Sequence, residues 1–246
     1  MTRKSARRPL RAALVLGAVG LLAAVLHSPV ASAATERWVD PAAAAATPGS
    51  GCGADAGYTT IQAAITASSA GDTVNVCPGT YTGPITINKA NLVLRGAKAG
   101  IPAGPTATPA NRGTDESVIE SSGANVVNWT GSATVGTTVD GFTLRNVGGS
   151  TAHRGITLPG TASHTIANNV IEYTGPTATD AQQAGMIGGT FNDLEIRNNR
   201  IDGFRYGFNL QSGNQTHAPT TIDGNHVTGF VVAGIVFGNN TANGQV

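Results

Sequence analysis

The sequence contains few aromatic residues, few charged residues and very little cysteine. Of its 246 residues, 5% are aromatic and 12% are charged, and there are two cysteines and two tryptophans. Beyond residue 33 the Lys and Arg residues are scattered, so the chain offers no basic patch for nucleic acid or for an anionic membrane surface. We therefore expect neither as a partner.

The one cluster of basic residues lies at the start of the chain. Five Lys and Arg residues come before or next to the apolar run 12–26, and Ala31-Ser32-Ala33 supplies the small residues of a cleavage site. Fifteen apolar residues are too few to cross ~30 Å of bilayer as a helix that rises ~1.5 Å per residue. We expect residues 1–33 to be a signal peptide, removed from a secreted protein that has no membrane span. Its removal takes five of the 15 Lys and Arg and none of the 14 acidic residues, which leaves a net charge of −4.

Both cysteines, Cys52 and Cys77, remain after cleavage, and an oxidising environment favours a disulfide between them. Two buried free thiols are the alternative. Neither a CxxC spacing nor accompanying histidines are present, so we expect no metal site at this pair.

Glycine is abundant, with 33 residues, and Thr, Asn and Val are plentiful, which favours short strands joined by tight turns. These residues form a repeat. The pattern Ile-x-x-Asn-x-Ile, or a variant of it, begins at Val139, Ile166, Ile196 and Ile222, at spacings of 27, 30 and 26 residues. A short strand that opens with glycine follows each copy. Such a period is typical of a solenoid, in which each repeat buries its apolar face against its neighbours.

Each period contains three short pieces in which apolar and polar residues alternate, which predicts three strands per coil and three parallel sheets. Asn169, Asn199 and Asn225 then fall at one corner of successive coils, where asparagine suits a turn of one or two residues. A β-sandwich of antiparallel strands is the alternative, but it gives no reason for the repeated asparagine.

Residues 58–87 precede the repeats and read as a short helix followed by strands, with Thr59 or Thr60 as the N-cap. The apolar face of the expected helix consists of Ile61, Ala64 and Ile65. With this helix and the repeats, residues 58–240 resemble the right-handed parallel β-helix proteins of the pectin-lyase-like superfamily. The resemblance implies an all-β fold, a three-sheet right-handed parallel β-helix whose N-terminal helix caps the first coil.

The expected organisation is a signal peptide (1–33), an N-terminal linker segment (34–57) and the β-helix domain (58–246), with a loop at 97–113 that leaves the coil. After Phe237 the sequence offers few apolar residues to cover the last coil, although solenoids need capping repeats. We therefore expect the domain to lack a C-terminal cap. Either the chain is a piece of a longer β-helix, or two open ends meet in end-to-end self-association.

In enzymes of this family the substrate groove usually runs along the sheet of glycine-led strands. The residues expected to face outward from that sheet are Thr157, Ile187, Asn209 and Val236. They include no carboxylate, whereas a glycosidase needs two carboxyl groups about 5–9.5 Å apart and a calcium-dependent lyase needs several oxygen ligands. We therefore expect no metal or other cofactor, with calcium relevant only if the protein is a lyase.

Candidate site residues remain at the edge of this groove. His153, Arg154 and Arg205 are catalytic candidates, since family lyases use Arg as a proton acceptor; the alternative is that they are ordinary solvated corner residues. The candidate substrate-binding residues are Tyr173, Tyr206 and Asn209. The insert 174–184 lengthens one coil beside the groove, where loops often determine specificity.

Two classes of function follow. The first is a secreted module that binds polysaccharide or cell-surface glycan, or has a surface or structural role, without a recognisable catalytic site. The alternative is a polysaccharide-active enzyme, a lyase or hydrolase that acts on uronic-acid polymers. The missing carboxylates favour the first.

Overall fold

A computed structural model describes residues 33–105, 112–131, 135–148, 152–158, 163–176, 183–188, 193–210, 220–237 and 244–245. The expected signal peptide lies outside the described residues except for Ala33, and so do residues 177–182 of the expected insert. Ala34–Val246 is a unit of its own. No helix in the described ranges is both long enough and apolar enough to cross a membrane.

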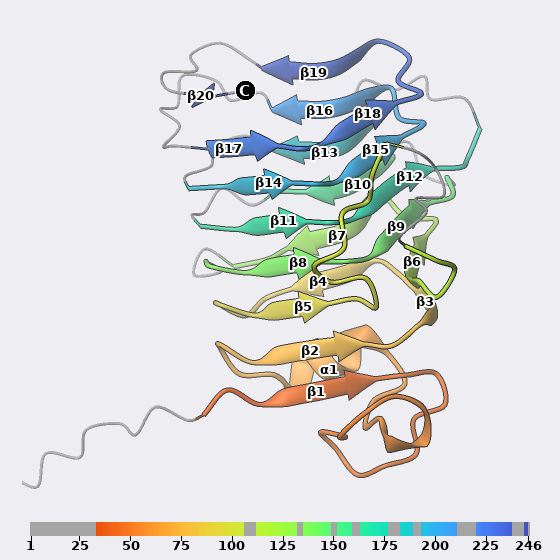
Figure 1. Cartoon of the computed structure of the whole chain (residues 1–246), viewed down its shortest axis with the longest axis vertical. Helices are drawn as coiled ribbons and strands as arrows, with labels where there is room; N and C mark the ends of the chain where they lie inside the picture. Colours follow the sequence, from red (N-terminus) through yellow and green to blue (C-terminus); the bar gives the residue numbers. More distant parts are fainter. Residues whose placement is uncertain are drawn as a thin grey trace, which may run out of the picture. The chain divides into compact units, whose positions relative to one another are not determined.

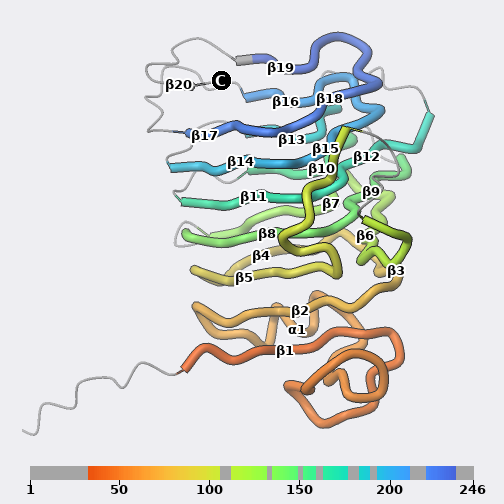
Figure 2. Tube along the Cα trace, in the orientation of Figure 1, coloured from red at the N-terminus to blue at the C-terminus, as the bar shows by residue number. Residues whose placement is uncertain are grey.

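From β2 onward the chain visits three parallel sheets in a fixed order, so that each coil adds one strand to each sheet (Figures 1 and 2). In spatial order, the described strands of the first sheet are β1 (Glu36–Val39), β2 (Thr73–Val76), β5 (Val93–Arg95), β8 (Thr138–Asp140), β11 (Thr165–Ala167), β14 (Glu195–Arg197), β17 (Thr220–Asp223) and β20 (Gly244–Gln245). Those of the second sheet are β3 (Gly79–Thr82), β6 (Ser117–Ser121), β9 (Thr143–Asn146), β12 (Val170–Tyr173), β15 (Arg200–Asp202) and β18 (His226–Thr228). Those of the third sheet are β4 (Ile85–Ile87), β7 (Asn125–Trp129), β10 (Arg154–Thr157), β13 (Ala184–Gly188), β16 (Tyr206–Leu210) and β19 (Ala233–Phe237).

The core fills the inside of the coils, because the central residue of each short first-sheet strand points inward. Successive strands are in register, which places these apolar residues above one another. One such row is fully buried and consists of Val74, Leu94, Val139, Ile166 and Ile196. The structure is therefore the predicted all-β, right-handed parallel β-helix with three sheets.

The first coil begins earlier than residue 58. Within the expected linker, β1 pairs in parallel with β2, and Val39 is buried beside Val76. Helix α1 (Ile61–Ala67) then packs against β1, β2 and β4. Its N-cap is Thr60, whose hydroxyl oxygen accepts a hydrogen bond from the Ala63 backbone N–H at 3.3 Å. As predicted, the buried side chains of the helix are Ile61, Ala64 and Ile65.

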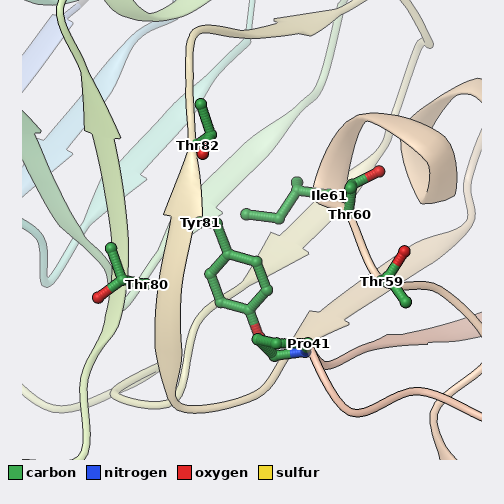
Figure 3. Close-up of a pocket in the computed structure, with 7 residues that line it drawn as sticks. All are labelled: Pro41, Thr59, Thr60, Ile61, Thr80, Tyr81 and Thr82. Carbon is green, nitrogen blue, oxygen red and sulfur yellow. The ribbon is translucent and has the colours of Figure 1, made fainter.

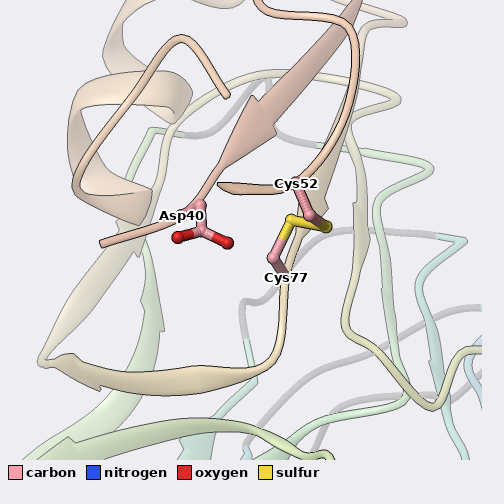
Figure 4. Close-up of side chains that lie close together, drawn as sticks. All are labelled: Asp40, Cys52 and Cys77. Carbon is pink, nitrogen blue, oxygen red and sulfur yellow. A yellow bond between two sulfur atoms is a disulfide. The ribbon is translucent and has the colours of Figure 1, made fainter. Parts of the chain in front are cut away.

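The predicted disulfide joins the segment before α1 to the end of β2 (Figure 4). Cys52 precedes the short 3-10 helix η1 (Gly53–Asp55), and its Cα atom lies 5.7 Å from that of Cys77. Asp40 holds the same segment, since its carboxylate accepts hydrogen bonds from the N–H groups of Gly53 and Ala42 at 2.9 and 2.8 Å. The segment is thus fixed to the first coil by a covalent bond and by hydrogen bonds.

The expected loop after β5 is present, but its described residues fold back along the stack. The Ala103 N–H donates to the carbonyl of Asn198 at 3.0 Å. Arg112 is 2% exposed and donates to the carbonyl of Asn168 at 2.7 Å. The loop follows the corner between the first and second sheets because its N–H and guanidinium groups satisfy backbone carbonyls there.

Asn169, Asn199 and Asn225 stack at this corner, which confirms the prediction. Asn225 Oδ1 accepts the backbone N–H of Asn199, and Asn199 Oδ1 accepts that of Asn169, both at 2.9 Å. Each side chain also donates to a carbonyl of the preceding coil, as Asn199 Nδ2 does to Ile166 at 2.8 Å. Phe142 ends the ladder where the repeat lacks asparagine, and its N–H donates to Asn169 Oδ1 at 3.0 Å.

The left-handed residue of each turn is the one before the ladder asparagine. Asn168 and Asn198 have φ of 56°, and Gly224 has φ of 61°. Asparagine and glycine adopt this region at low cost, so the turn explains why the ladder residue is preceded by Asn or Gly in each repeat.

The glycines that open the third-sheet strands are required by close packing. A Cβ atom at Gly155 or Gly185 would overlap Cγ2 of Ile171 or Ile201 from the second sheet. At Gly185 it would also press on the carbonyl oxygen of Gly207 in the next coil. The second and third sheets can therefore approach this closely only because positions 155 and 185 are glycine.

The last described coil exposes apolar side chains. Ile235 is in register with Phe208, which is fully buried, yet Ile235 is 40% exposed because no described third-sheet strand follows β19. Ile235 therefore occupies the same inward position as Phe208, without a described strand to cover it. The other large apolar residues exposed beside it are Phe230, Val231 and Val232.

We predict that Gly185→Ala lowers the free energy of unfolding by about 3 kcal/mol, since overpacking a filled core costs about 1–3 kcal/mol and the backbone carbonyl cannot rotate away. Denaturant-induced unfolding measures this change. Gly51→Ala is the control, because a Cβ there meets only Asp55 Cβ, at 3.8 Å. Equal unfolding midpoints for the two variants would show that position 185 does not require glycine.

We further predict that Asn199→Ala costs about 3 kcal/mol, because it leaves the Asn169 N–H and the Ile166 carbonyl buried without a partner. Asn225→Ala should cost only about 1 kcal/mol, since Asn225 lies at the half-exposed end of the ladder. Chemical unfolding of both variants compares them directly. The ladder account is contradicted if Asn225→Ala costs as much as Asn199→Ala.

Candidate functional site

The outer face of the third sheet carries two rows of side chains. The first row consists of Thr86, Asn128, Thr157, Ile187, Asn209 and Val236, and it includes every residue expected to face outward. The second row consists of Asn125, Arg154, Ala184, Tyr206 and Ala233. Neighbours in a row are one coil apart, about 4.8 Å. Neither row, within the described residues, contains a carboxylate.

Two polar side chains of this face are engaged or buried. The Thr157 hydroxyl donates to Asn125 Oδ1 at 2.6 Å. Asn209 is 7% exposed, and no described residue donates a hydrogen bond to its Oδ1 atom. An unpaired buried carbonyl oxygen costs about 1–3 kcal/mol, and because this Oδ1 atom is itself buried it is not open to a ligand in the described structure.

The structure brings three of the expected site residues together. Arg154 and Tyr206 are the Cα partners of Ala184 on either side, which places their backbones about 10 Å apart with a methyl group between them. Both are half-buried, and Tyr206 does not belong to the core cluster. The Arg205 guanidinium carbon lies 5.6 Å from the centroid of the Tyr206 ring, a cation–π distance.

His153 and Tyr173 lie elsewhere than expected. They are 7% and 9% exposed, and their ring centroids are 5.1 Å apart. The Tyr173 ring also lies 5.8 Å from that of Phe204, and burial raises the pKa of Tyr173. These rings form a stack inside the corner between the second and third sheets. Tyr173 therefore has no open face on which a sugar could lie, which corrects its expected role.

A buried polar cluster that the sequence did not reveal lies at the other end of the third-sheet strands. Trp129 Nε1 donates to Thr137 Oγ1 at 2.9 Å, and this oxygen lies 2.6 Å from His164 Nδ1. The hydroxyl oxygen accepts from the indole, and it either donates to Nδ1 or accepts from it according to the tautomer of His164. Burial lowers the pKa of His164 to about 4. No local pattern signals this cluster, since its members belong to different turns.

Acidic residues on neighbouring coils occur on the second sheet. Glu120, Arg145, Glu172 and Asp202 form one row there. Arg145 lies 2.6 Å from Glu172 and 3.3 Å from Glu120, and Asp202 pairs with Arg200. Burial lowers the pKa of Arg145, but the two carboxylates outweigh it and raise that pKa. Glu172 and Asp202 are thus each paired with an arginine of their own sheet.

One cluster of potential metal ligands occurs among the described residues, formed by Asp40, Cys52 and Cys77 (Figure 4). The two sulfur atoms are bonded to each other, so the cluster offers no thiolate for a metal ion.

A small hollow of about 170 Å³ lies beside α1 (Figure 3). Its lining consists of Pro41, Thr59, Thr60, Ile61, Thr80, Tyr81 and Thr82. The Tyr81 hydroxyl is already engaged with the carbonyls of Cys77 and Val39, at 2.9 and 3.2 Å. The hollow contains no charged group, and it is smaller than typical ligand pockets of about 300–1,000 Å³. It is therefore a weaker candidate than the third-sheet face.

Comparison of the chain with models of protein families, with curated proteins and with solved structures found no match. The candidate site consequently rests on the geometry described above.

We predict that His164 makes the protein less stable in acid. An unfolded histidine binds a proton near pH 6.5, whereas folded His164 resists protonation until about pH 4. The unfolded state therefore binds more protons between these values, and acidification through this window lowers the free energy of unfolding by up to about 3 kcal/mol.

Unfolding curves measured at pH 7 and at several values down to pH 4 test this prediction against His164→Gln. Carboxylates contribute equally to both proteins, so the variant should lose less stability on acidification. Parallel profiles for the two proteins would show that His164 does not titrate as its burial requires.

Proposed function

We propose that this protein is a secreted β-helix of the pectin-lyase-like superfamily. It binds an acidic polysaccharide along the outer face of its third sheet and does not cleave it.

The chemical composition of that face carries the proposal. Arg154 brings a positive charge to this face, and that charge attracts the carboxylates of an acidic polymer. Tyr206 supplies a flat ring with a polar tip. Thr157 donates its proton to Asn125, which leaves its hydroxyl oxygen to accept a hydrogen bond from a sugar hydroxyl. Since the rows repeat about every 4.8 Å along the stack, the face suits an extended polymer better than a single sugar.

The distribution of acids supports binding without cleavage. Hydrolysis of a glycosidic bond needs a pair of carboxyl groups on the two sides of that bond. The described third-sheet rows offer none, and the neighbouring acids Glu172 and Asp202 on the second sheet are each held by an arginine. A calcium-dependent lyase would need several oxygen ligands at one point, and the described rows do not provide them either.

Two features support secretion. The basic and apolar start of the chain has the pattern of a signal peptide. The Cys52–Cys77 disulfide is the kind of bond that persists in oxidising compartments.

Isothermal titration with polygalacturonate oligomers tests the proposed binding face. We predict that Arg154→Gln weakens binding by about tenfold or more, the loss of roughly 1.5–3 kcal/mol expected for a charge-assisted hydrogen bond. Arg154→Lys should bind the oligomers more tightly than Arg154→Gln, because it keeps the positive charge.

The matched control is Arg197→Gln, which removes a guanidinium that is 51% exposed on the first sheet. Its affinity should equal that of the unchanged protein. Equal losses in Arg154→Gln and Arg197→Gln would mean that the polymer responds only to net charge and that the third-sheet face is not the site.

A further inference from the structure

A second hollow, of about 360 Å³, lies against the first sheet near its N-terminal end. This volume falls in the range of about 300–1,000 Å³ that ligand sites usually have. Trp38, Asn75 and Arg95 contribute the large side chains of its lining. The rest consists mainly of the Cys52–Cys77 disulfide, Pro78 and small residues of the segment 96–99.

The three large side chains belong to one row of the first sheet. Asn75 is the Cα partner of Trp38 in β1 and of Arg95 in β5, so an amide lies between an indole and a guanidinium in steps of about 4.8 Å. Trp38 is half-buried and does not belong to the core cluster, whereas the second tryptophan, Trp129, is 7% exposed within it. Trp38 therefore presents aromatic surface that the core does not use.

Arg95 is available to a ligand. It is exposed and forms no ion pair with any described residue. Its acidic neighbour in the row, Asp140, is engaged elsewhere: it accepts the Gly100 N–H at 3.2 Å and Asn168 Nδ2 at 2.7 Å. Among the described residues that line the hollow, Arg95 is the only charged one.

We propose that this hollow binds one carboxylate-bearing sugar unit. The indole of Trp38 supports the apolar face of the sugar ring, and the Arg95 guanidinium bonds to the carboxylate. Asn75 donates to Glu36 at 3.3 Å through Nδ2, which leaves Oδ1 to accept a hydrogen bond from a sugar hydroxyl. The site goes beyond the proposed function, because it lies on another sheet and shares no residue with the third-sheet face.

Tryptophan fluorescence tests this site with trigalacturonate as the probe. Trp129 is enclosed and hydrogen-bonded to Thr137, so a change in emission on ligand binding reports Trp38. We expect a saturable change with trigalacturonate and an affinity at least about tenfold weaker for its trimethyl ester, which has the same shape and no charge.

Arg95→Gln should weaken trigalacturonate binding at this hollow by about tenfold, so that the acid and its trimethyl ester bind with equal affinity. Followed by calorimetry, Trp38→Phe should retain binding at this hollow, and Trp38→Ala should abolish it there while the third-sheet face still binds. The control is Arg197→Gln, an exposed arginine farther along the same row, which should behave as the unchanged protein.

The proposal is overturned if emission shows no saturable change, if the ester binds as well as the acid, or if Arg95→Gln binds as tightly as the unchanged protein. Arg154→Gln separates the two sites. It should leave the Trp38 response intact, so failure at one sheet is distinguishable from failure at the other.

Discussion

The close approach of successive coils at the corner between the second and third sheets is the constraint on which the structure depends. Gly185 fits there because any Cβ would overlap Ile201 and press on the carbonyl of Gly207. At the corner between the first and second sheets, Asn199 Oδ1 accepts a hydrogen bond from the backbone N–H of Asn169 in the coil before it. Both contacts recur along the stack and hold the strands in register. Side chains at equivalent positions therefore form rows with a spacing of about 4.8 Å.

Rows of this kind give each sheet its own surface chemistry. On the second sheet, charged side chains form ion pairs with one another, as Arg145 does with Glu172 and Glu120. The third sheet offers guanidinium, amide, hydroxyl and phenol groups without acids among its described rows. The first sheet places an indole, an amide and a guanidinium in sequence. The proposed ligand bears carboxylates and would bind the last two faces, whereas the acids of the second sheet are engaged by Arg145 and Arg200.

The fold could be predicted from the sequence because its constraints are periodic. The spacing of Asn169, Asn199 and Asn225 predicted the ladder, and Cys52 and Cys77 were the only cysteines that could pair. The candidate site was less predictable. Whether a corner residue such as Tyr173 points inward depends on how adjacent coils pack, and the repeat does not show this. Trp38 was missed because β1 precedes the first recognisable repeat.

We propose that the protein holds an acidic polysaccharide without cutting it, because the described third-sheet rows contain no carboxylate. The most direct test is to incubate the protein with polygalacturonate, with and without calcium, and to follow the ultraviolet absorbance of unsaturated products together with new reducing ends. The account predicts that the polymer is bound and keeps its length under both conditions. Unsaturated products or new reducing ends that form in proportion to the protein added would contradict it.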